Sequence, residues 1–207
     1  MKWIGLTGGI ATGKSTVSRI LVESGCPVVD ADQLAREVVA VGSPGLLKTV
    51  EEFGTDILLD DGQLDRKKLG QLIFSNPEKR ARLEKIIHPL VRALAKQKRN
   101  DLERAGYSLA FYDVPLLFEK QMQSQFDIIV VVGCSAELQV KRLMEREGLT
   151  KDEADRRVQS QISISDKIKW ANEVLDNSGT IENLRAQVKD LLKRLGESET
   201  KKNKSAT

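Results

Sequence analysis

The chain has 207 residues, of which 40% are hydrophobic and 30% charged, and its formal net charge is +3. This length is enough for one domain with a sizeable core, no apolar run approaches the roughly 20 residues of a membrane helix, and two cysteines are too few for a disulfide framework. A small net charge with interspersed signs does not indicate nucleic-acid binding, and the N-terminus lacks a secretory pattern, so we expect a cytoplasmic protein of undefined oligomeric state.

Five runs have the composition of strands and alternate with segments of helical period. They lie at residues 3–7, 27–30, 109–114, 126–133 and 173–176. This alternation predicts an α/β fold, with a mostly parallel sheet and helices on both faces. The run at 126–133 is apolar without alternation, as expected of a strand covered on both faces, and is the candidate central strand.

Several helix boundaries carry local signals. Ser43 and Asn76 each precede a proline, which is typical of an N-cap followed by the first helical residue. Thr150 and Glu153 have the spacing of a capping box. The last helix is expected to open at Thr180 and to end at Gly196.

Two segments between strands are longer than the dozen or so residues that a crossover needs. The first is helical and follows the second strand; the second carries Arg142 and Arg146 and is suited to closing over anions. We therefore expect one domain with a core, an insertion, a lid and a polar disordered tail. The core is expected to comprise residues 1–40, 107–135 and 171–196. The insertion is expected at about 41–106, the lid at about 136–170 and the tail at 197–207.

Residues 8–15, GGIATGKS, match the phosphate-loop pattern G-x-x-x-x-G-K-[ST] between a predicted strand and a predicted helix. Backbone N–H groups of such a loop and the positive end of the helix dipole together bind a polyphosphate. Lys14 is expected to reach the outer phosphates, Ser15 to bind Mg²⁺ and Thr16 to lie near the inner phosphate. The predicted nucleotide-binding residues are Gly9, Ala11, Thr12, Gly13, Lys14, Ser15 and Thr16.

Carboxylates follow two of the predicted strands, at the edge where α/β folds bind ligands. Asp30 and Asp32 end the second strand, and phosphoryl transfer needs a carboxylate that positions and deprotonates the acceptor hydroxyl. Alternation along an extended segment places both on the same side, while Asp32 also occupies a candidate N-cap position. Asp113 ends the third strand, where it either holds a magnesium-bound water or faces solvent.

Taken together, these motifs resemble the dephospho-CoA kinase family in order and spacing, over nearly the whole chain to about residue 195. The residues that carry the resemblance are 7–16, Asp30-Ala31-Asp32, His88-Pro89, 115–119 (PLLFE) and Asp176-Asn177. The resemblance implies ATP- and Mg²⁺-dependent phosphorylation of the 3'-hydroxyl of dephospho-CoA to give CoA and ADP, the last step of coenzyme A biosynthesis. It also implies a three-layer P-loop NTPase fold with a five-stranded parallel sheet, a helical acceptor-side insertion and a lid.

The resemblance also implies roles for individual residues. It selects Asp32 over Asp30 as the catalytic base, and it aligns Arg142 and Arg146 with lid arginines that neutralise charge on the transferred group. His88 becomes an acceptor-side contact, although its own surroundings indicate only a hydrogen-bonded residue at a helix kink. Many relatives have Gly-Ser where this chain has Ala11-Thr12, which predicts intact ATP binding with modest retuning.

Two other functions stay open at this point. A nucleoside or nucleotide kinase shares the loop and the lid but takes a smaller acceptor. A nucleotide-dependent switch would hydrolyse ATP without an acceptor, although the residues after the last strand, 173–179, lack the base-reading Asn-Lys-x-Asp pattern of guanine-specific switches.

Overall fold

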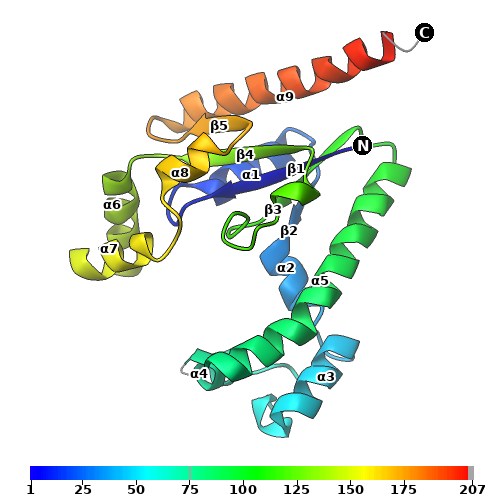
Figure 1. Ribbon diagram of the computed structural model, residues 1–207, viewed down its shortest axis with the longest axis vertical. Helices are drawn as coiled ribbons and strands as arrows, with labels where there is room; N and C mark the ends of the chain where they lie inside the picture. Colours follow the sequence, from blue (N-terminus) through cyan, green and yellow to red (C-terminus); the bar gives the residue numbers. More distant parts are fainter. Residues whose placement is uncertain (75, 205–207) are drawn as a thin grey trace. The chain divides into compact units, whose positions relative to one another are not determined.

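The computed structural model describes residues 1–74 and 76–204, with side chains described as far as Gly196. Its five strands form one sheet in the order β2-β3-β1-β4-β5 (Figure 1). They are β1 (Lys2–Gly8), β2 (Val28–Asp30), β3 (Leu109–Asp113), β4 (Ile128–Gly133) and β5 (Glu173–Asp176). The predicted parallel α/β sheet is thus confirmed. β1 is its middle strand, and β4, the run expected to be a central strand, lies between β1 and β5 and is almost entirely buried.

The chain divides into two compact units. The first comprises Met1–Val29 and the chain from Leu102 onward, and contains the sheet. Its helices are α1 (Lys14–Glu23), η2 (Gln123–Gln125), α6 (Ala136–Glu147), α7 (Lys151–Gln159), α8 (Ile164–Lys169) and α9 (Ile181–Lys204). The second unit, Asp30–Asp101, is helical. Its elements are α2 (Ala31–Glu37), α3 (Pro44–Phe53), η1 (Thr55–Ile57), α4 (Arg66–Phe74) and α5 (Pro77–Arg104, which ends in the first unit).

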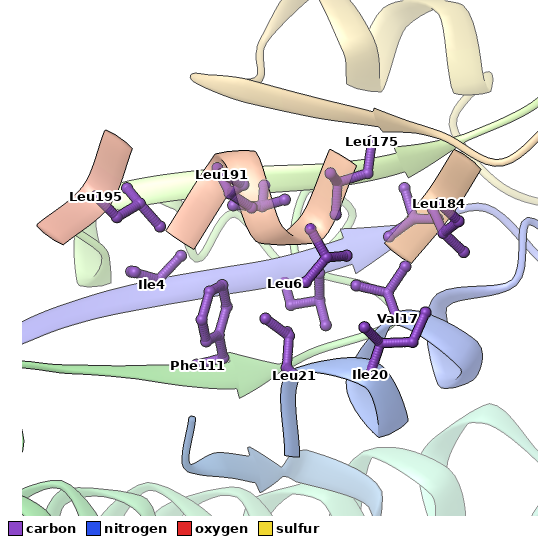
Figure 2. Close-up of a cluster of buried hydrophobic side chains, with 13 residues drawn as sticks. Ile4, Leu6, Val17, Ile20, Leu21, Phe111, Leu175, Leu184, Leu191 and Leu195 are labelled. Atoms are coloured by element: carbon purple, nitrogen blue, oxygen red, sulfur yellow. The ribbon is translucent and has the colours of Figure 1, made fainter. Parts of the chain in front are cut away.

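The main core of the first unit lies between the sheet and the helices α1 and α9 (Figure 2). Ile4 and Leu6 point from alternate positions of β1 toward leucines that recur along α9, among them Leu184 and Leu191. All four are fully buried. Burial of each such side chain contributes about 1.5–3 kcal/mol, so this face anchors the strand that leads into the phosphate loop.

Gly5 on β1 leaves room for the segment that follows β3. A methyl group at this position would lie 2.8 Å from Leu117 Cδ1 and 2.9 Å from Phe126 Cγ, closer than carbon atoms pack. The Thr7 hydroxyl also donates a hydrogen bond to the Pro115 carbonyl at 3.2 Å. The segment 115–119 is therefore held directly against β1, near the end where the phosphate loop begins.

Three predicted helix boundaries in the two units are confirmed. Ser43 Oγ accepts a hydrogen bond from Leu46 N at the start of α3, and Asn76 Oδ1 accepts one from Lys79 N at the start of α5. The capping box at the start of α7 is present in full. These caps satisfy N–H groups that the first turn of a helix leaves without partners.

The sequence predicts a helix kink at His88-Pro89, and α5 does continue through Pro89 and bend along its length, because proline removes one N–H and displaces the preceding turn (Figure 1). The expectation that Gly196 ends the last helix is wrong, since α9 continues to Lys204. A glycine inside a helix costs only about 1 kcal/mol, so Gly196 alone does not end α9. The disorder expected of the polar tail stays a prediction, and residues 205–207 lie outside the described chain. Among the described helices, none is long and apolar enough to cross a membrane.

Candidate active site

The phosphate loop joins β1 to α1, as the sequence predicts. Gly13, the N-cap of α1, has φ 91°, and no side chain caps the helix there. The first-turn N–H groups are therefore not occupied by a capping side chain and can bind an anion. Ala11 also has a positive φ, 58°, which costs a non-glycine residue about 1 kcal/mol. The departure from Gly-Ser in this loop thus carries a conformational strain.

Lys14 is held by the carboxylate that ends β3. Its ammonium pairs with Asp113 Oδ1, and the Ser18 hydroxyl donates to Asp113 Oδ2 at 2.6 Å. Asp113 is only 2% exposed, so the alternative in which it faces solvent is wrong. The pairing compensates a buried negative charge and fixes the lysine at the carboxyl edge of the sheet.

Asn177, after β5, supports the loop from a second direction. Its side-chain amide donates to the Thr12 carbonyl at 2.8 Å, and a methyl group on Gly13 would lie 2.0 Å from the same amide nitrogen. Arg142 Nη2 donates to the Asn177 carbonyl at 2.8 Å, while its Nη1 is buried with no hydrogen-bond partner among the described residues. The structure therefore brings Arg142 to the phosphate loop through Asn177.

The second predicted lid arginine has a different environment. Arg146 is exposed and donates to Glu147 at 2.6 Å, and Arg157 pairs with the same carboxylate. The hydrogen bond from Arg146 is the main cause that lowers the pKa of Glu147. Of the two arginines, only Arg142 is connected to the loop by the hydrogen bonds described.

The remaining loop residues differ in solvent exposure, and therefore in which of their groups a ligand can reach. Ser15 is exposed in the first turn of α1, and Thr16 and Gly9 are half-buried. Thr12 is fully buried, and its hydroxyl donates to the Gly9 carbonyl at 2.9 Å, so its side chain stabilises the loop itself. The backbone N–H of Thr12 donates to the same Gly9 carbonyl at 3.3 Å, which closes the turn of the loop.

Asp32 and His88 lie in the second unit. The helix α2 begins directly after β2, at Ala31, and its N-cap is Asp30, which accepts hydrogen bonds from Asp32 N and Gln33 N. The expectations that Asp32 caps this helix and that an extended chain aligns the two carboxylates are therefore wrong. Asp32 is exposed in the first turn of α2, and His88 is exposed beside Pro89 on α5.

The donor set suits Mg²⁺ bound together with a nucleotide. Among the described residues no group of three or more acidic, cysteine or histidine side chains could hold a metal ion by itself. Mg²⁺ in phosphoryl-transfer sites usually takes one or two protein oxygens and completes its shell with phosphate and water. The exposed Ser15 hydroxyl and the Asp113 carboxylate fit that pattern.

Sequence reasoning missed an ion pair between α8 and the segment 115–119. Lys167 on α8 is completely buried, with its ammonium 2.7 Å from Glu119 Oε1 and 3.4 Å from the Gly8 carbonyl. The same Glu119 oxygen accepts a hydrogen bond from Ile162 N at 3.1 Å. A lysine between Ile164 and Ile168 on a short helix was the only local signal of this contact.

A family model described as dephospho-CoA kinase matches residues 2–183. The chain belongs to the dephospho-CoA kinase family. It is therefore a kinase with a P-loop fold, as the resemblance of its motifs predicted, and both the family and the fold class are confirmed.

Individual relatives agree with this assignment. The kinase is 49% identical over 197 residues to the dephospho-CoA kinase of Bdellovibrio bacteriovorus, which covers 95% of this chain and 98% of the relative. A solved structure from Thermus thermophilus is 36% identical with a TM-score of 0.79, over 94% of this chain and 97% of the other. The dephospho-CoA kinase of Campylobacter jejuni is 28% identical with a TM-score of 0.74, over 95% and 98%. The similarity extends over nearly the full length of each protein.

Proposed function

We propose that this kinase transfers the γ-phosphate of ATP to the 3'-hydroxyl of dephospho-CoA, giving CoA and ADP as the last step of coenzyme A biosynthesis. The observation that carries the proposal is the uncapped N-terminus of α1 beside Lys14, within a chain of the dephospho-CoA kinase family. The two free cysteines are compatible with a reducing compartment, so we assign the reaction to the cytoplasm.

On the donor side, loop N–H groups and Lys14 bind the phosphates. The loop residues Gly9, Ala11, Thr12 and Gly13 contribute backbone groups, and Thr16 contributes the first turn of α1 near the inner phosphate. When ATP enters, Lys14 exchanges part of its contact with Asp113 for phosphate oxygens. Asp113 would then be available, together with Ser15, to hold Mg²⁺.

Mg²⁺ supplies charge neutralisation on the phosphates when it is bound. Ser15 and Asp113 are the residues of this chain that would hold it. Arg142 and Arg146 extend the same neutralisation from α6, four residues apart on one helical face. Because Arg146 pairs with Glu147 at an exposed position, exchange of that partner for a phosphate costs little.

On the acceptor side, Asp32 accepts the proton of the 3'-hydroxyl and His88 contacts the acceptor. The hydrogen bonds of Asp30 assign it to the capping of α2, and the family resemblance selects Asp32 as the catalytic carboxylate of this motif. A carboxylate in this role aligns the hydroxyl oxygen with the γ-phosphate, and positioning supplies most of the rate enhancement.

The test is CoA formation by the purified protein from ATP and dephospho-CoA, with the product identified by mass. Asp32→Asn keeps the size of the side chain and removes the base, so CoA formation should fall by about 10³-fold while the thermal midpoint and the KM for ATP stay unchanged. Asp60→Asn, a change of an exposed carboxylate in the same unit, is the control and should retain full activity.

Three outcomes would contradict the proposal. ATP hydrolysis indifferent to dephospho-CoA would indicate a nucleotide-dependent switch. Preferential phosphorylation of adenosine or AMP in a competition assay would indicate a nucleoside or nucleotide kinase. Equal activities of Asp32→Asn and Asp60→Asn would exclude Asp32 as the base.

A further inference from the structure

Ile10, inside the phosphate loop, has both of its backbone polar groups bound by glutamine side chains. Gln139 Nε2 donates to the Ile10 carbonyl at 2.6 Å, and Gln161 Oε1 accepts from Ile10 N at 2.8 Å. Gln139 lies in the first turns of α6, and Gln161 lies between α7 and α8. Two separate segments of the lid region therefore bind the two peptide groups that flank the Cα of Ile10.

The glycine at position 9 is explained by this arrangement. A methyl group on Gly9 would lie 2.4 Å from Gln139 Nε2, so any larger residue would displace the amide from the Ile10 carbonyl. Gln139 is only 2% exposed, and a buried amide of this kind is costly unless it is hydrogen-bonded. Gly9 is thus required for space, whereas Gly13 is required for its positive φ as well.

The side chain of Ile10 is attached to the same region. Ile10 and Ala11 pack against the buried cluster formed by Val140, Leu143 and Ala154 on α6 and α7. The cluster contacts the side chains of Ile10 and Ala11, and the two glutamines bind the backbone of Ile10. Together they hold the backbone at the position where Ala11 adopts its left-handed conformation.

We propose that Gln139 and Gln161 are positioning residues for ATP binding. They fix the peptide groups of Ile10, so that its carbonyl oxygen stays turned away from the phosphates, which it would repel, and the N–H groups that follow stay directed toward them. The inference rests on the proposed function, since it assumes that ATP binds at this loop. It adds two residues that do not touch the nucleotide and act through Ile10.

A Gln→Glu substitution at position 139 and at position 161 distinguishes the positioning role from the effect of an added negative charge. Glutamate has the shape of glutamine and adds one negative charge at either position. At position 161 it keeps an oxygen to accept from Ile10 N, whereas at position 139 it replaces the donor with a second acceptor facing the Ile10 carbonyl. Gln159→Glu, two residues before Gln161 and exposed at the end of α7, is the control for charge.

We expect Gln139→Glu to raise the Kd for MgATP, measured by titration calorimetry without acceptor, about 30-fold relative to Gln159→Glu. Gln161→Glu should stay within about threefold of that control. In steady-state assays the KM for ATP should follow the Kd, while the KM for dephospho-CoA stays unchanged, which a general loss of structure would not produce.

If Gln139→Glu does not fold, Gln139→Met and Gln161→Met carry the test, and each should raise the KM for ATP about tenfold relative to the wild type. CoA formation by the wild type tests the proposed function separately, so its failure is distinguishable from failure of this inference. Equal Kd values for the glutamate variants at 139, 159 and 161, or methionine variants with unchanged KM for ATP, would overturn the positioning role.

Discussion

The two units prepare their functional side chains in different ways. In the first unit Lys14, Asp113 and Asn177 are each held by defined partners within the fold. In the second unit Asp32 and His88 are exposed, Asp32 in the first turn of α2 and His88 beside Pro89 on α5. A polyphosphate is recognised by fixed backbone groups that gain from being rigid, whereas a catalytic base and an acceptor contact need access to a mobile substrate. Substitutions of Lys14, Asp113 and Asn177 should therefore couple activity to stability, and those of Asp32 and His88 should separate them.

The largest expected effect comes from Lys14→Met. Activity should fall by about 10³-fold because the outer phosphates lose their cation. The thermal midpoint should fall as well, since Asp113 is left buried without its counter-charge, at a cost of about 3–5 kcal/mol. Steady-state kinetics and thermal unfolding measure the two effects.

Lys14→Met combined with Asp113→Asn is the matched control. The double variant should regain most of the lost stability, because the carboxylate that needs a cation is gone, and stay inactive. If Lys14→Met is as stable as the wild type, the difference between the two units disappears, because the activity of Lys14 would not depend on a contact that stabilises the first unit.

The two arginines of α6 allow a residue held within the fold, Arg142, to be compared with an exposed one, Arg146, on the same helix. Arg142→Met and Arg146→Met should each lower kcat by about 10²-fold. Only Arg142→Met should also lower the thermal midpoint, because it leaves the Asn177 carbonyl without its donor, whereas Arg146 loses an exposed ion pair of little value. Equal midpoints for the two variants would show that Arg142 does not support the loop.

A smaller effect is expected from Asp30→Ala in the second unit. Removal of the N-cap of α2 should lower the free energy of unfolding by about 1 kcal/mol, measured in urea. Asp30→Ser should restore most of it, because serine also caps helices. A loss of stability from Asp32→Asn larger than that from Asp30→Ala would reverse the roles of the two carboxylates.

The smallest effect is a pH dependence confined to the first unit, which contains both cysteines. Burial raises the pKa of Cys26 and of Cys134 above the ordinary value, and for Cys134 the nearby Arg142 opposes part of the rise. Unfolded thiols ionise near pH 8.5 while the folded ones stay protonated, so their contribution is complete below about 8.5 and is lost as pH rises through the folded pKa. Thermal unfolding from pH 7 to 10 should show a shallower decline for Cys26→Ala/Cys134→Ala than for the wild type, and parallel curves would contradict this.

Local patterns predicted the five strands, the phosphate loop and the caps, because each depends on neighbours a few residues away. The capping of α2 by Asp30 instead of Asp32 was not predicted, since it depends on whether the helix begins directly after the strand or two residues later. The glutamines that bind Ile10 lie 129 and 151 residues from it in sequence, and glutamine in a polar helix has no distinctive pattern. The roles assigned to the loop residues and to Asp32, His88, Arg142 and Arg146 all remain predictions.

The ion pair between Lys167 and Glu119 restricts how the sequence of this kinase can change over generations. Loss of either partner leaves a charge enclosed by protein, so a single substitution at one position is strongly disfavoured, whereas a paired change to apolar residues can be tolerated. Lys167 also contacts the Gly8 carbonyl, so even a paired change must leave the start of the phosphate loop undisturbed. Positions 119 and 167 should therefore covary among related kinases, because a sequence in which only one of the two has changed is disfavoured.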